Sequence, residues 1–221
     1  MKIILFKISI GLLLFTLMGC NQKKKELNAA ILPISKEIKY AKGFKIDNYN
    51  GYSVLRITNT WPESKQIYTY ILQEKNAKIP DSLKQFTVIS VPIKKIVVTS
   101  TTHIPALELL GVEKTLIGFP STDFISSIKT RALIDARKVR EVGKNENLNT
   151  EILIDLAPDV IIGFGLNNTN PTLDNLQKSG LNVILQWRLE RKNSISKSRM
   201  DKAIRRIIWF GNKGKSDFFR N

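Results

Sequence analysis

The chain has 221 residues, of which 43% are hydrophobic, and it carries 35 Lys and Arg against 19 Asp and Glu. This much apolar material supports one globular domain or slightly more, and it excludes a disordered tail. The single Cys excludes a disulfide framework, and with the single His it excludes the usual protein ligand sets for transition metals. The formal charge of +16 is unevenly placed, because residues 187–221 hold 11 basic and 3 acidic residues. Residues 26–186, with 19 basic and 16 acidic residues, are close to neutral.

Residues 1–19 are predicted to be a signal peptide. Their apolar run, residues 3–17, is short for a membrane span and suits the apolar part of a signal peptide. Leu17-Met18-Gly19-Cys20 resembles a bacterial lipobox, in which the small residue leaves room for the peptidase and the thiol accepts a diacylglycerol. We therefore expect a lipid anchor on Cys20 and a polar tether over residues 20–37. The alternative is a plain signal or anchor helix with a chance Cys at its end.

Residues 38–91 are predicted to be rich in strands. Their content of Tyr, Ile, Val and Thr, with turn signals at Asn48-Tyr49-Asn50-Gly51 and Trp61-Pro62, favours an antiparallel meander. The expected strands cover residues 40–46, 52–58, 67–72 and 86–91.

Residues 92–186 alternate short apolar strands with helices. This rhythm predicts an α/β fold in which helices flank a parallel sheet. The expected strands cover residues 96–99, 116–119, 160–163 and 183–185, and the expected helices cover residues 103–110, 150–156 and 171–179. Thr102 is predicted to cap the first helix and Asn149 the second. Gly111 is expected to end the first helix in the left-handed conformation, and Gly180 to end the third.

Ligands of a parallel α/β sheet meet the loops at the carboxyl ends of its strands. The candidate loops are Ser100-Thr101-Thr102-His103, Pro120-Ser121-Thr122-Asp123 and Phe164-Gly165-Leu166-Asn167. Their hydroxyl, amide and aromatic groups favour binding over catalysis, and no spacing identifies a nucleophile and base around the lone His103. His103 is either a structural or capping residue or a ligand contact. No strand is followed by a phosphate-binding Gly-rich loop. We therefore expect no enzyme, no resident cofactor and no metal site.

Several stretches of the α/β part together carry a resemblance. They are IVVTSTTHIPALELLG at 96–111, VGK at 142–144, NTEILIDLAPDVIIG at 149–163 and LQKSGLNVI at 176–184. Their order and spacing over about 90 residues resemble the N-terminal lobe of the cobalamin and iron-siderophore class of ABC-importer substrate-binding proteins. YAKGF at 40–44 and NTWP at 59–62 resemble the extra N-terminal portion of the lipoprotein branch of that class.

The resemblance implies two α/β lobes, joined by a long helix, with the ligand in the cleft between them. It places one wall of the cleft at a set of loop residues: Ser100, Thr101, Thr102, His103, Pro120, Ser121, Phe164 and Leu166. It assigns Glu151 to docking on the importer permease; the alternative is a surface Glu favoured by the helix dipole. Glu108 is expected on a solvated helix face. The implied ligand is a chelate such as cobalamin, haem or a ferric siderophore, and the implied location is the cell envelope, on the periplasmic side and lipid-anchored.

Residues 187–221 depart from the class. They hold six of the ten Arg and can be read as a basic tail that touches anionic lipid or nucleic acid, although export argues against nucleic acid. Permissible codons from Leu185 onward, read one nucleotide later, give FNGDWREKTASLKAEWIKQFGELFG, which resembles the class after its fourth strand. We therefore expect a frameshift near Leu185, a chain truncated after the first lobe, and weak ligand binding. The alternative function is a surface interaction lipoprotein with no transport role.

The frameshift is checked by resequencing the gene. We expect the codons after Leu185 to encode the N-G-D-W element in the shifted frame. An unbroken frame, with nothing resembling the class downstream of the stop codon, would contradict this expectation.

Overall fold

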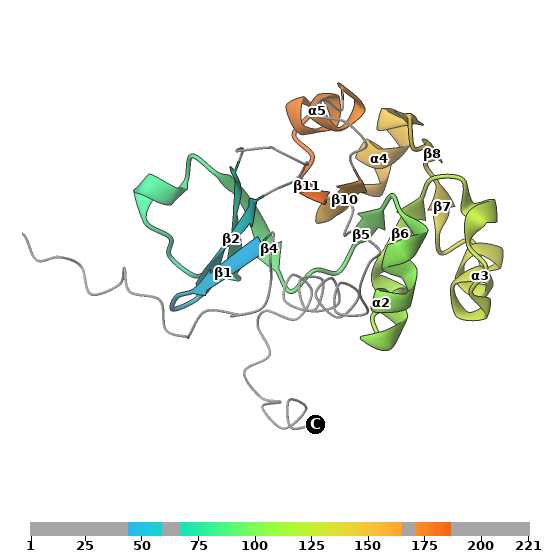
Figure 1. Ribbon diagram of the computed structural model, residues 1–221, viewed down its shortest axis with the longest axis horizontal. Helices are drawn as coiled ribbons and strands as arrows, with labels where there is room; N and C mark the ends of the chain where they lie inside the picture. The colour runs from blue at the N-terminus through green and yellow to red at the C-terminus, as the bar shows by residue number, and fades with distance from the viewer. Residues whose placement is uncertain (1–43, 59–66, 165–170, 187–221) are drawn as a thin grey trace, which may run out of the picture. The chain divides into compact units, whose positions relative to one another are not determined.

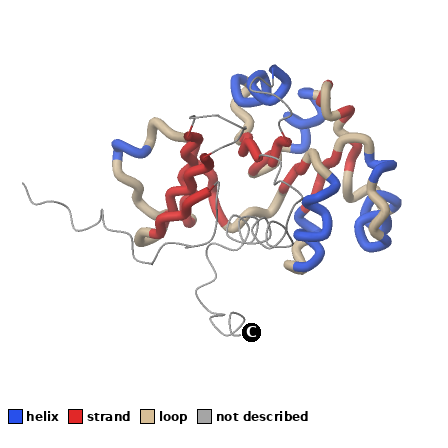
Figure 2. Tube along the Cα trace, viewed as in Figure 1, coloured by secondary structure: helices blue, strands red, loops and turns tan. Residues whose placement is uncertain are grey.

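In the computed structural model, the described residues are 44–58, 67–164 and 171–186. Figure 1 labels most of their helices and strands, and Figure 2 separates strands from helices by colour. The strands are β1 (Phe44–Asn48), β2 (Tyr52–Thr58), β3 (Ile67–Glu74), β4 (Thr87–Val91), β5 (Ile96–Val98), β6 (Leu116–Phe119), β7 (Arg140–Glu141), β8 (Gly143–Lys144), β9 (Asn147–Leu148), β10 (Val160–Phe164) and β11 (Val183–Gln186). The helices are α2 (Ile104–Leu109), α3 (Ile128–Asp135), α4 (Thr150–Leu156) and α5 (Pro171–Lys178), with short 3-10 turns η2 (Asp81–Leu83), η3 (Thr101–His103), η4 (Glu113–Thr115) and η5 (Thr122–Phe124).

Several sequence predictions lie outside the described residues. They are the signal peptide 1–19, the tether 20–37 with Cys20, residues 38–43 of the strand-rich segment, NTWP at 59–62, Leu166 and the tail 187–221. Within the described part of the chain, no helix is long and apolar enough to cross a membrane.

The predicted α/β fold is confirmed by a five-stranded parallel sheet. Its order is β11-β10-β5-β6-β7. Strand β5, which comes first along the chain among these five, therefore lies in the middle of the sheet. The chain places β6 and β7 on one side of β5, then returns to place β10 and β11 on the other. The strand order therefore reverses between β5 and β10, and α/β proteins bind ligands at the carboxyl ends of the strands at such a point.

Both faces of this sheet are buried, which explains its continuous apolar strands. Side chains alternate between two cores, so that Ile96 and Val98 join one core while Val97, between them, joins the other. The first core contains side chains of α2 and of the four-stranded sheet, and the second contains those of α4 and α5. Figure 1 shows α2 and α3 on one side of the parallel strands and α4 and α5 on the other.

The strand-rich segment forms a four-stranded sheet in the order β1-β2-β3-β4. Its first three strands pair antiparallel, as predicted, but β4 runs parallel to β3. A parallel pair needs a crossover of about a dozen residues, and residues 75–86 between the two strands provide it. The meander prediction is therefore wrong for the fourth strand, because that connection is too long for a hairpin.

The sequence did not predict α3, β7 or the β8–β9 hairpin. Helix α3 has no apolar stripe, since the one buried side chain within it is Thr130 and Ile128 is 88% exposed. Strand β7 has two residues, and both are exposed. Neither element carries the periodic apolar pattern from which strands and helices are predicted.

The predicted helix ends are mostly confirmed. The Asn149 side chain accepts a hydrogen bond from the Ile152 amide, and Gly111 and Gly180 have φ of 67° and 84°. The prediction that Thr102 caps the first helix is wrong. A 3-10 turn precedes α2, and Ser100 caps that turn, since the Ser100 Oγ accepts from the Thr102 amide; α2 itself follows His103, whose side chain makes no capping bond.

Tyr70 of β3 links the four-stranded sheet to the parallel sheet. The Leu185 amide of β11 donates a hydrogen bond of 3.2 Å to the Tyr70 hydroxyl. The ring is 2% exposed, and this burial raises the pKa of Tyr70 to about 12, although the hydrogen bond from Leu185 opposes the rise. A folded-state pKa above the ordinary 10.0 means that the protonated hydroxyl stabilises the fold fully below pH 10.

We predict that Tyr70→Phe lowers the free energy of unfolding of the full chain by about 1–3 kcal/mol at neutral pH, because the Leu185 amide loses its partner. In the unsubstituted protein, the Tyr70 contribution of about 2–3 kcal/mol is lost as the pH rises from about 10 to about 12. Urea unfolding across this pH range should show that loss, and the variant should lack it. Tyr49→Phe is the control; equal effects from the two variants would contradict the prediction.

Candidate functional site

The predicted loops after β5 and β6 lie at the same edge of the parallel sheet. We call this the carboxyl edge and define it as residues 99–103 after β5 and 120–124 after β6. The third predicted loop follows β10, whose last residue, Phe164, pairs with Gln186 of β11. Leu166 of that loop lies outside the described residues. The structure therefore describes two of the three predicted loops.

The loop after β5 presents hydroxyl groups. Thr101 and Thr102 are exposed, and Ser100 is partly buried. The Ser100 and Thr102 hydroxyl oxygens lie 2.8 Å apart, and the Ser100 carbonyl accepts a bond of 3.1 Å from the His103 amide. These contacts hold a tight turn whose hydroxyls can still accept or donate toward solvent.

His103 lies inside the fold rather than on the surface. Its side chain is 1% exposed at the end of η3, where it immediately precedes α2. The side chain makes no capping hydrogen bond to the helix. Of the readings drawn from the sequence, the buried position favours a structural role.

The loop after β6 contains both buried and exposed side chains. Pro120 is buried, and Ser121 adopts φ 47°, the left-handed region that non-glycine residues seldom occupy. Thr122 is 7% exposed, whereas Phe124, two residues later, is 76% exposed. The sequence interpretation omitted Phe124, although an aromatic residue just beyond a strand end was the available signal.

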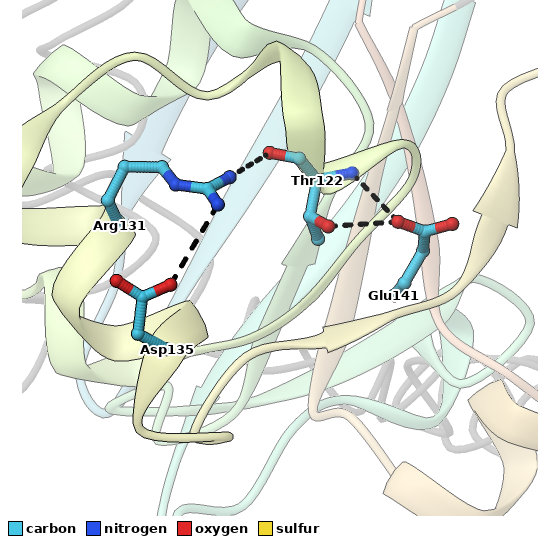
Figure 3. A network of polar contacts seen from close by, with 4 residues as sticks. All are labelled: Thr122, Arg131, Asp135 and Glu141. Atoms are coloured by element: carbon cyan, nitrogen blue, oxygen red, sulfur yellow. Dashed lines mark hydrogen bonds and ion pairs between the residues drawn. The ribbon is translucent and has the colours of Figure 1, made fainter.

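Polar side chains from two neighbouring elements hold Thr122, as Figure 3 shows. Glu141, the last residue of β7, accepts from the Thr122 amide at 3.2 Å and from its hydroxyl at 2.9 Å, both at Oε2. Arg131 of α3 donates to the Thr122 carbonyl at 3.0 Å and lies 3.8 Å from Asp135. The sequence placed Thr122 in a candidate loop but missed Arg131 and Glu141, since nothing in the chain marks α3 as a helix or β7 as a strand beside β6.

Glu108 also differs from its expectation. The sequence placed it on a solvated helix face, but its side chain is partly buried and accepts hydrogen bonds from the hydroxyls of Ser127 and Thr130. The bond from Thr130, whose side chain is 1% exposed, measures 2.6 Å. Glu108 therefore ties α2 to the first turn of α3, because two hydroxyl donors there need an acceptor.

Glu151 is exposed in the first turn of α4. Backbone bonds connect this end of α4 to the carboxyl edge, since the Asn149 amide donates to Val142 and the Ser121 amide donates to Gly143, both at 2.9 Å. The sequence-predicted docking residue and the candidate cleft wall therefore share one end of the parallel sheet.

Pro158-Asp159-Val160, the P-D-V element of the motif, lies at the opposite end of the sheet, where the strands begin. Asp159 accepts from the amides of Lys94 and Lys95 at 2.7 and 2.8 Å, and its carbonyl accepts from the Asn182 side chain at 3.1 Å. These bonds join the segments that lead into β5, β10 and β11. This part of the motif holds the sheet together and does not contact the carboxyl edge.

Over residues 44–58, 67–164 and 171–186, no three His, Cys, Asp or Glu side chains gather where they could hold a metal ion. The described side chains of the carboxyl edge offer hydroxyls, the exposed carboxylate of Asp123 and one exposed aromatic ring. Such groups orient and stack against a ligand through shape and a few polar contacts.

No protein-family model and no curated protein sequence matches the chain. Solved structures match its fold. The petrobactin-binding protein YclQ from Bacillus subtilis has 16% identity and a TM-score of 0.46, over 70% of this chain and 45% of its own. The iron uptake ABC transporter substrate-binding protein PiuA from Streptococcus pneumoniae has 18% identity and a TM-score of 0.41, over 53% and 39%. The periplasmic haem-binding protein HutB of Vibrio cholerae has 20% identity and a TM-score of 0.41, over 52% and 41%.

The chain spans less than half the length of each of these three structures. At these identities and TM-scores the likeness concerns the fold. The proteins found are described as binding proteins for iron uptake, petrobactin and haem.

Proposed function

We propose that this chain supplies one ligand-facing lobe of a substrate-binding lipoprotein that delivers a chelated metal compound, such as cobalamin, haem or a ferric siderophore, to an ABC importer. The carboxyl edge is the observation that carries the proposal. There the loop after β5 exposes Thr101 and Thr102, and the loop after β6 exposes the Phe124 ring. The strand order reverses beside the first of these loops, after β5. The motif resemblance in the sequence supports the ligand class.

The role proposed for this edge is binding rather than catalysis. A bulky chelate presents an extended, partly apolar face, against which an aromatic ring can stack and hydroxyls can form hydrogen bonds. One wall covers about half of such a ligand, short of the roughly 70–90% that a good pocket buries.

Lipid anchoring through Cys20 and docking through Glu151 belong to the same proposal. The lipobox-like LMGC sequence supports the anchor, which would hold the chain at the outer side of a membrane beside the importer permease. The exposure of Glu151, at the end of the sheet that carries the candidate wall, supports docking. A carboxylate there can pair with a basic side chain of a permease.

Hydrogen-exchange mass spectrometry of the full chain tests ligand binding. We expect millimolar cyanocobalamin, haemin or a ferric hydroxamate siderophore to slow exchange of the amides at residues 99–103 and 120–124, because the ligand covers those loops. Phe124→Ala should weaken this protection about tenfold, as the loss of a stacking ring costs roughly 1–1.5 kcal/mol. Ile154→Ala is the control, since this side chain is 54% exposed on α4. Protection by none of the compounds, or only at other residues, would refute the proposal.

Photo-cross-linking in cells tests the anchor and the docking residue together. A photoreactive residue in place of Glu151 should capture the permease encoded next to this gene, because this face would meet it. Cys20→Ala should release the chain from the membrane fraction and abolish the capture. The same photoreactive residue at Glu146, exposed in the β8–β9 hairpin, measures the background. If no permease gene lies beside this gene and the photoreactive residue at position 151 cross-links no permease, the results would favour a surface interaction lipoprotein instead.

A further inference from the structure

The connection between β6 and α3, residues 120–127, alternates anchored and presented side chains. We call it the β6–α3 loop. Thr122 and Ile125 point inward, with exposed fractions of 7% and 3%, whereas Asp123 and Phe124 are exposed. The direction in which Phe124 projects therefore depends on how firmly Thr122, two residues earlier, is held.

Glu141 is the main anchor of Thr122. One oxygen, Oε2, accepts from both the amide and the hydroxyl of Thr122. Hydrogen bonds to a charged acceptor are stronger than neutral ones, and two donors on one residue fix its orientation as well as its position. Arg131 binds the Thr122 carbonyl from the other side, so side chains of β7 and α3 hold the backbone between them (Figure 3).

The backbone of the loop needs such an anchor. Ser121, directly before Thr122, lies in the left-handed region at φ 47° and ψ 65°, which a residue with a Cβ adopts when its surroundings enforce it. Its amide donates to the Gly143 carbonyl at 2.9 Å, next to the strand that carries Glu141. The Phe124 amide then donates to the Ser121 carbonyl at 3.0 Å, which closes the turn.

We propose that Glu141 is a positioning residue for ligand binding: it holds Thr122, and through Thr122 it fixes the β6–α3 loop in the conformation that presents Phe124 at the carboxyl edge. This inference rests on the proposed function, which places the ligand against that loop. Glu141 itself acts on the ligand through the loop rather than by contact.

Hydrogen exchange in the full chain, without ligand, provides the first test. Glu141→Ala should speed exchange of the amides at residues 121–125 about tenfold or more, because the loop loses two hydrogen bonds to a charged acceptor. Glu141→Gln keeps an oxygen that can accept both bonds, so exchange should stay within about threefold of the unsubstituted chain. Glu146→Ala removes the same charge from a nearby exposed position and should change nothing. Unchanged exchange in Glu141→Ala would overturn the proposal.

Ligand protection provides the second test, with millimolar cyanocobalamin, haemin or a ferric hydroxamate siderophore as probes. For any probe that protects the unsubstituted chain, Glu141→Ala should weaken the apparent affinity about tenfold, and Glu141→Gln should restore it. Equal affinity in Glu141→Ala would overturn the proposal while leaving the proposed function intact. If no probe protects the unsubstituted chain, the proposed function fails, and the exchange test still decides whether Glu141 positions the loop.

Thr122→Val covers the case in which Glu141→Ala does not fold. This substitution removes the hydroxyl donor and keeps the amide donor. The exchange rate of the amides at residues 121–125 should therefore lie above that of the unsubstituted chain and below the rate expected when both bonds to Glu141 are lost. Exchange equal to that of the unsubstituted chain would count against the proposal.

Discussion

A parallel sheet that is covered on both faces leaves only the ends of its strands for polar chemistry. In this protein the alternating side chains of β5, such as Val97 and Val98, enter two different cores, so neither face of the strand can carry a binding group. Polar side chains are therefore confined to the two ends of the sheet. At the amino end Asp159 joins three strands, and at the carboxyl end the hydroxyl-rich loops meet solvent. The division between an end that joins the strands and an end with exposed polar loops follows from burial.

One of the two described loops at the carboxyl edge, the β6–α3 loop, is held in place by side chains of other elements. Carboxylates anchor the connection between β6 and α3 near both of its ends, Glu141 at Thr122 and Glu108 at Ser127. Such anchors reduce the ordering cost that a flexible loop would add to binding. A wall prepared in this way suits a protein that recognises a rigid ligand by shape.

Sequence reasoning recovered the parts of the fold that have a periodic apolar signal. Strands β2 and β6 and helix α4 have the predicted bounds, because apolar residues and helix caps such as Asn149 mark them. Helix α3 was missed because its side chains are mostly outside the core, and β7 was missed because two exposed residues carry no pattern. The site followed the same rule. The loops that contain Ser100 and Ser121 follow β5 and β6 at the predicted strand ends. Glu141 was not predicted, because its place depends on pairing between β6 and the missed strand β7.

The hydrogen bond between Tyr70 and Leu185 has a consequence for association between molecules. Strand β11 is an edge strand, and its unpaired backbone groups would offer a template for another chain. The outward amide of Leu185 donates a hydrogen bond to the Tyr70 hydroxyl. The Gln177 side chain donates one of 3.2 Å to the Val183 carbonyl. Two side chains thus cover the edge at alternate positions, and a second copy of the sheet cannot extend it by strand pairing at those residues without first displacing them. At the β11 edge, the side-chain contacts from β3 and α5 therefore oppose strand pairing with another chain.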